Sequence, residues 1–175
     1  MELPLGSPAP SFSLPGVDGR TWSSADFREP LLLLVVTCNH CPVSIAYEER
    51  LVALAKQYAG RVALVAINPN DATTHPGDSL DAMKVRAQER GFPFPYLRDE
   101  SQEVARALDA KCTPDPFLFD ASRKLVYAGR IDDASRDPSK VTSRDLARAI
   151  DLALAGKAID FTVHPAMGCS VKWKR

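Results

Sequence analysis

Residues 31–41 read Leu-Leu-Leu-Leu-Val-Val-Thr-Cys-Asn-His-Cys, so a run of six apolar residues is followed almost at once by a Cys-x-x-Cys motif. A short, continuous apolar run predicts a strand buried on both faces. Apolar residues then recur at helical spacing from Tyr47 to Tyr58, which predicts a helix after the motif. Because a helix start carries unpaired N–H groups and the positive end of the dipole, we expect it to favour the thiolate form of the first cysteine, Cys38.

This placement indicates redox chemistry at Cys38 and Cys41. A thiolate is the attacking species in disulfide exchange, and a second thiol three positions later can resolve the mixed disulfide that the first one forms. A zinc site is a competing interpretation, but it needs two further ligands, and the remaining candidates are scattered singly (Cys112, Cys169, His75 and His164). A structural disulfide or two inert buried thiols is the other alternative.

Composition narrows the class of protein. The 175 residues fit one domain with a full core, spanning 1–175. The chain has 22 basic and 22 acidic residues without a long block of either sign, so we expect neither nucleic acid nor a membrane surface as a partner. The first ten residues lack the features of a signal peptide, and no apolar run approaches the ~18 residues of a membrane span. We therefore expect a cytoplasmic protein, in which four cysteines favour catalysis or metal binding over a disulfide-stapled scaffold.

Strand and helix signals alternate along the chain. The Asp18-Gly19 turn, between two short apolar segments, predicts an N-terminal β-hairpin. Periodicity and turn residues predict an α/β order of elements, with further strands at 31–37, 62–67, 95–97, 117–120 and 124–129 and helices over 47–58, 80–90, 104–108 and 146–154.

This order of elements, together with several motifs, resembles the thioredoxin-like superfamily. The opening Gly6-Ser7-Pro8-Ala9-Pro10-Ser11-Phe12 is similar to that of its peroxiredoxin branch, and 113–120 is similar to the segment where a cis-proline precedes the last hairpin. A peroxiredoxin-like group (AhpC/TSA-type redoxins with a Cys-x-x-Cys motif) is the closest resemblance, through 38–42, 68–71, 130–133 and 168–174. The resemblance implies a thioredoxin-like α/β fold, in which helices flank a central mixed β-sheet of about four or five strands and an N-terminal β-hairpin extends it.

The resemblance also implies roles for individual residues. Cys38 takes the attacking position and Cys41 the resolving position, Pro114 is the expected cis-proline, and Thr113 would offer its backbone to an extended substrate strand. The implied function is that of a thiol-disulfide oxidoreductase that needs no organic or metal cofactor. Its expected partners are protein or small-molecule thiols and disulfides, and its oligomeric state is left open.

The motif departs from that of thioredoxin at several positions. Thr37 stands where thioredoxin has Trp, Asn39-His40 replaces Gly-Pro, and the strand at 31–36 lacks the buried acid of that family. An imidazole near the Cys38 sulfur would stabilise its thiolate, and with it the reduced form. We therefore expect His40 to make the site more oxidising than a Gly-Pro version would be.

A thiol peroxidase is the competing enzyme. The peroxidatic cysteine of peroxiredoxins corresponds to Cys41, in a pattern with Thr three residues before it and Pro seven before it. Here Cys38 replaces that Thr and Leu34 replaces that Pro. Since those two groups hold the peroxide in line with the sulfur, we expect any peroxidase activity to be weak.

Two further cysteines remain to be placed. Cys112 lies two positions before Pro114, so we expect it close to the Cys38 sulfur, where it would form an alternative disulfide, complete a metal site or serve as a buried core thiol. A non-enzymatic copper or zinc carrier would use Cys38, Cys41 and either Cys112 or His40. Cys169 falls in a C-terminal tail, 157–175, that we expect to pack on the domain, with Trp173 as its anchor.

Overall fold

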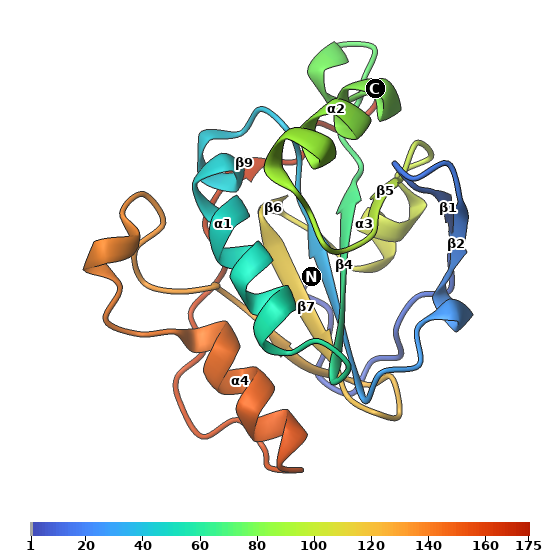
Figure 1. Cartoon of the computed structure of the whole chain (residues 1–175). Coiled ribbons are helices and arrows are strands. Elements are labelled where there is room, and N and C mark those ends of the chain that lie inside the picture. Colours follow the sequence, from blue (N-terminus) through green and yellow to red (C-terminus); the bar gives the residue numbers. More distant parts are fainter. Residues whose placement is uncertain (1) are drawn as a thin grey trace.

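The central sheet of the protein has five strands in the order β5-β4-β3-β7-β8, as seen in a computed structural model that describes residues 2–175 (Figure 1). β3 pairs in parallel with β4 and antiparallel with β7, so the sheet is mixed. The expected thioredoxin-like fold class is confirmed. The strands are β3 (Leu31–Val36), β4 (Val62–Asn68), β5 (Tyr96–Arg98), β7 (Asp115–Phe119) and β8 (Leu125–Ala128).

Side chains of β3 alternate between the two faces of the sheet, because successive residues of a strand point to opposite sides. One set packs beneath the helices α1 (Pro42–Gln57), α2 (Leu80–Arg90) and α4 (Asp145–Leu154). The other set packs against α3 (Glu103–Ala107) and the N-terminal segment. Both faces are therefore covered, which explains why the strand reads as an unbroken apolar run.

The N-terminal hairpin is present. Its strands, β1 (Ser13–Pro15) and β2 (Thr21–Ser23), are antiparallel and flank the Asp18-Gly19 turn. Trp22 of the hairpin stacks on Phe27, with ring centroids 5.4 Å apart, and so joins it to the core. Short 3₁₀ turns occur at Ser24–Asp26, Pro76–Asp78 and Pro138–Lys140.

A second small sheet joins the end of the chain to the segment before β7. β6 (Cys112–Thr113) pairs antiparallel with β9 (Cys169–Ser170). Figure 1 shows β6 and β9 beside the start of α1, where the Cys-x-x-Cys motif lies. Neither strand has a sequence signal, because two residues are too few to show a periodic pattern.

Candidate active site

The two cysteines of the motif lie between the end of β3 and the start of α1. The helix begins at Pro42, so the residue that caps it is Cys41 and not Cys38. Both side chains are nearly covered, with 3% of Cys38 and 1% of Cys41 exposed. The expectation that Cys38 is the cysteine at the helix entrance is therefore wrong by three residues.

Because Cys41 and not Cys38 lies at the start of the helix, Cys41 has the lower pKa of the two, which is the reverse of the expectation. A hydrogen bond from the Cys38 thiol, with a further one from the Cys169 thiol and the nearby N–H of Ser44, lowers the pKa of Cys41 to about 3. The pKa of Cys38 is raised, because its proton is engaged with Cys41, its sulfur is buried and the carboxylate of Asp78 lies near it. The direction of the shifts makes Cys41 the more acidic of the two, which agrees with its place at the N-terminus of α1.

A buried carboxylate beneath the motif comes from the loop after β4. Asp78 is fully buried and accepts hydrogen bonds from the backbone N–H of Asn39 (2.7 Å) and the side-chain amides of Asn68 and Asn70 (both 3.1 Å). β3 and β4 are parallel neighbours, so the loops after them meet at the same edge of the sheet. The sequence interpretation missed Asp78, and its position in the loop after a strand next to β3 is the signal that could have found it.

His40 is bound to this carboxylate. Its Nδ1 lies 2.5 Å from Oδ2 of Asp78, and its ring stacks on that of His75 with centroids 5.2 Å apart. The imidazole was expected to stabilise a Cys38 thiolate, and this effect stays a prediction, while the structure places its Nδ1 on Asp78. Its clearest effect on the site is to pair with the negative charge that disfavours a thiolate at Cys38.

The Thr113–Pro114 peptide bond is cis, as expected. The Thr113 side chain reaches Cys38, with Oγ1 3.3 Å from Sγ. In its protonated form the Cys41 thiol donates to the carbonyl oxygen of Thr113 at 3.4 Å. The backbone edge expected to receive a substrate strand therefore lies directly against both sulfurs.

Cys112 is the buried thiol that was one of its expected alternatives. Its thiol donates to the carbonyl of Pro114 at 3.8 Å, and burial, Asp115, Cys41 and Cys169 together raise its pKa to about 12. Adjacent residues of a strand point to opposite sides, so the Thr113 side chain, and not that of Cys112, meets Cys38. Cys112 is a protonated, buried thiol in this structure.

Three described side chains lie close enough together to hold a metal ion. The sulfur of Cys38, a ring nitrogen of His40 and a carboxylate oxygen of Asp78 all lie within 4.8 Å of one another. Thiolate, imidazole and carboxylate are all zinc ligands, so the donor set fits that ion. The set expected for a metal carrier was Cys38, Cys41 and either Cys112 or His40, so Asp78 stands here in the place of Cys41.

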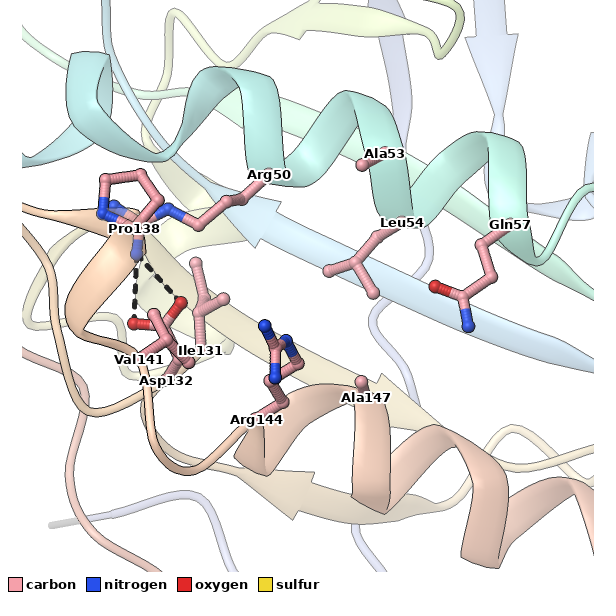
Figure 2. Close-up of a pocket in the computed structure, with 10 residues that line it drawn as sticks. All are labelled: Arg50, Ala53, Leu54, Gln57, Ile131, Asp132, Pro138, Val141, Arg144 and Ala147. Carbon is pink, nitrogen blue, oxygen red and sulfur yellow. Dashed lines mark hydrogen bonds and ion pairs between the residues drawn. The ribbon is translucent and has the colours of Figure 1, made fainter.

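Two pockets bear on where a ligand could sit. One, between α1 and α4, carries the charged pair of Arg50 and Asp132 (Figure 2) and has no cysteine or histidine in its lining. The other lies beside Pro114 and is lined by Tyr47, Asp132 and Met167 of the tail. The second adjoins the cis-proline, and a smaller pocket lined by Thr37, Cys38 and Tyr96 reaches the redox motif itself.

Residues 2–175 contain no helix that is both long and apolar enough to cross a lipid bilayer.

Comparisons with known proteins agree with this fold. A conserved uncharacterized protein from Geobacillus kaustophilus is 43% identical, with a TM-score of 0.92 over 98% of this chain and 93% of that chain. A hypothetical protein from Sinorhizobium meliloti 1021 is 41% identical, with a TM-score of 0.94 over 99% of this chain and 97% of that one. A thiol:disulfide interchange protein of the thioredoxin family from Chlorobium tepidum TLS is 23% identical, with a TM-score of 0.66 over 88% and 99%, and shares the fold.

No curated protein matches the sequence. The model of the AhpC/TSA family matches residues 5–128, from the N-terminal extension through the Cys-x-x-Cys motif and Pro114 to the end of β8. Because that match covers well over half of the chain and the architecture agrees with it, the protein belongs to the AhpC/TSA family of thioredoxin-like redoxins.

Proposed function

We propose that the protein is a thiol-disulfide oxidoreductase that exchanges disulfides through Cys38 and Cys41. The observation that carries this proposal is that both sulfurs meet Thr113 beside the cis peptide bond, Cys38 at its Oγ1 (3.3 Å) and Cys41 at its carbonyl oxygen (3.4 Å). An enzyme of this kind needs one thiolate to attack and one thiol to resolve, and this pair supplies both. Membership of a redoxin family supports the same chemistry.

Cys41 is the attacking residue in this proposal, which reverses the assignment made from the sequence. Its thiolate attacks one sulfur of a substrate disulfide, forms a mixed disulfide and releases the other half of the substrate as a thiolate. Cys38 then gives its proton to that released thiolate, and its sulfur attacks Sγ of Cys41. The Cys38–Cys41 disulfide forms, the second half of the substrate leaves as a thiolate, and two electrons have passed from the protein to the substrate.

Oxidation of the reduced protein by glutathione disulfide tests the proposal. The reduced protein should acquire a Cys38–Cys41 disulfide, detected as a linked peptide after acid quench, and release two equivalents of glutathione. Cys41→Ser should release none, whereas Cys112→Ser, which removes a buried thiol outside the pair, should react like the parent protein. Failure of the Cys38–Cys41 disulfide to form, or equal reactivity of Cys41→Ser, would refute the proposal.

The order of attack is read separately in a Cys169→Ser background, because the Cys169 thiol also contacts Cys41. With Cys38→Ser added, glutathione should remain attached to Cys41. With Cys41→Ser added instead, little glutathione should attach to Cys38, since the pKa of that thiol is raised. Stable glutathionylation of Cys38 alone would restore the original assignment.

A thiol peroxidase acting through Cys41 is the second candidate, and the low pKa of this cysteine is the observation that favours it. The thiolate would attack hydrogen peroxide, become a sulfenic acid and release water, and Cys38 would then condense with the sulfenic acid to give the same disulfide. Because Cys38 stands in place of the usual Thr, we expect peroxide to react more slowly than glutathione disulfide. Faster oxidation by peroxide at equal concentrations would make the peroxidase the better assignment.

A further inference from the structure

The end of the chain occupies the edge where a substrate strand would dock. β9 pairs antiparallel with β6, and Cys169 stands opposite Thr113 in this register. Added strands are a common means of binding an extended peptide, since the main chain supplies the hydrogen bonds. Here the added strand is the protein's own C-terminal tail.

A glycine allows the tail to come this close. A Cβ atom on Gly168 would lie 2.0 Å from the carbonyl oxygen of Thr113, so any larger residue would displace the tail from this edge. Gly77, in the loop that carries Asp78, is different, because a Cβ there meets no atom within 4 Å and its backbone is not in the left-handed region. The two glycines form a matched pair for testing the docked tail.

Residues that follow β9 hold the tail in place. The backbone N–H of Lys172 donates to Oδ1 of Asn70 at 2.9 Å, and its carbonyl accepts from the N–H of Asp71 at 2.8 Å. Gln102 binds the tail at two further points, through Lys172 O and the N–H of Lys174, both at 3.0 Å. Val171 is buried in the core next to these contacts. Cys169 is therefore positioned by anchored neighbours on its C-terminal side.

The docked tail brings a third sulfur to the redox pair. Cys169 stands opposite Thr113, whose carbonyl oxygen lies 3.4 Å from Sγ of Cys41, and it is near enough to this sulfur to lower the pKa of Cys41. Cys169 is partly exposed, whereas Cys38 and Cys41 are nearly covered. A thiol approaching from solvent would therefore meet Cys169 before it meets either cysteine of the motif.

We propose that Cys169 is a third redox cysteine, which forms a disulfide with Cys41 inside the docked tail and links the buried pair to thiols outside. The inference rests on the proposed function. When the tail is displaced, Cys41 attacks an external disulfide and carries one half of it. When the tail docks again on β6, the Cys169 thiol loses its proton to solvent and its sulfur attacks Sγ of Cys41. The Cys41–Cys169 bond forms, and the bound half of the substrate leaves as a thiolate.

A dithiol in solution would then reduce this disulfide. One of its sulfurs attacks Cys169 and releases Cys41 as a thiolate, and its second sulfur attacks the mixed disulfide and frees the Cys169 thiol. The dithiol leaves as a disulfide, so the electrons balance. Attack at Cys169 is favoured because this residue is partly exposed, whereas Cys41 is nearly covered.

Cys38→Ser provides the test, because it removes the competing resolving thiol. After reaction with glutathione disulfide and rapid acid quench, peptide mass spectrometry should find Cys41 linked to Cys169 and little glutathione on Cys41. Adding Gly168→Ala should slow formation of the Cys41–Cys169 link at least about tenfold, because an undocked tail lowers the effective concentration of the Cys169 thiol. Adding Gly77→Ala instead should leave it unchanged. Circular dichroism checks that each variant is folded, and quenching the parent protein early in its reaction should also show the Cys41–Cys169 link.

Two results would overturn the inference: glutathione that stays on Cys41 of Cys38→Ser while Cys169 remains a free thiol, or a Cys41–Cys169 link that forms equally fast with Gly168→Ala. Failure of the proposed function would look different. In that case Cys41 would not react with glutathione disulfide even in the Cys38→Ser/Cys169→Ser protein, where no third thiol intervenes.

Discussion

Replacing Cys38 by alanine tests whether its thiol is what makes Cys41 acidic. Alanine removes the hydrogen bond to the Cys41 sulfur, which is the largest cause of the lowered pKa of Cys41. A hydrogen bond to a charged group contributes about 1.5–3 kcal/mol, and 1.36 kcal/mol corresponds to a tenfold change in an ionisation constant. The pKa of Cys41 should therefore rise by about 1–2 in Cys38→Ala. Cys38→Ser is the matched control, because its hydroxyl can still donate and the rise should be smaller.

The assay is the ultraviolet absorbance of the thiolate near 240 nm, titrated in the presence of a phosphine reductant. Since the pKa of Cys41 is lowered to about 3, its thiolate should persist from pH 8 down to pH 5 and disappear only as the pH falls further. The signal should vanish in Cys41→Ser and remain in Cys112→Ser. Near-ultraviolet circular dichroism at each pH separates loss of the thiolate from acid unfolding.

The reasoning would be refuted by a reduced protein that shows no thiolate at pH 6, or by a thiolate that survives Cys41→Ser. Equal pKa values of Cys41 in Cys38→Ala and Cys38→Ser would show that Cys38 does not act through a hydrogen bond. A thiolate lost in Cys38→Ser but kept in Cys41→Ser would place the charge on the other sulfur.

Three other substitutions test the surroundings of the pair. His40→Ala should lower the reduction potential, measured against glutathione, by some tens of millivolts. The imidazole then no longer offsets the charge of Asp78, which destabilises the thiolate of the reduced pair more strongly, and about 30 mV corresponds to 1.4 kcal/mol. An unchanged potential would show that His40 has no effect on the pair. Thr113→Val removes the hydroxyl that lowers the pKa of Cys38, so resolution by Cys38 should slow several-fold in stopped-flow oxidation, and an unaltered rate would contradict this role. Glu48→Ala should lower the free energy of unfolding in urea by about 1.5–3 kcal/mol, because Arg86 and Arg90 lose their charged hydrogen bonds to this buried carboxylate but keep contact with solvent; a loss below about 1 kcal/mol would show that the pairs are loosely held.

Much of the fold could be predicted because its signals are local. Each of these signals is set by residues close together in the sequence: a run of six apolar residues, an Asp-Gly turn and helical spacing. The five strands of the central sheet were anticipated, and their ends differ from the predictions by one or two residues. The Thr113–Pro114 bond was expected to be cis from its resemblance to a known segment, and it is. By contrast, β6 and β9 were missed, because strands of two residues show no periodic pattern.

By itself, the sequence determined which sulfurs could do redox chemistry and the strand and helix between which they lie. Tertiary structure alone decided how the charge is distributed among them. The acidity of a thiol depends on neighbours within a few ångströms, and two of these, Asp78 and Cys169, come from the loop after β4 and the C-terminal tail. Which cysteine caps the helix depended on where the helix starts, a boundary that periodicity does not fix to within three residues. The roles proposed for Cys38 and Cys41 therefore rest on three-dimensional contacts that the spacing of the motif does not encode.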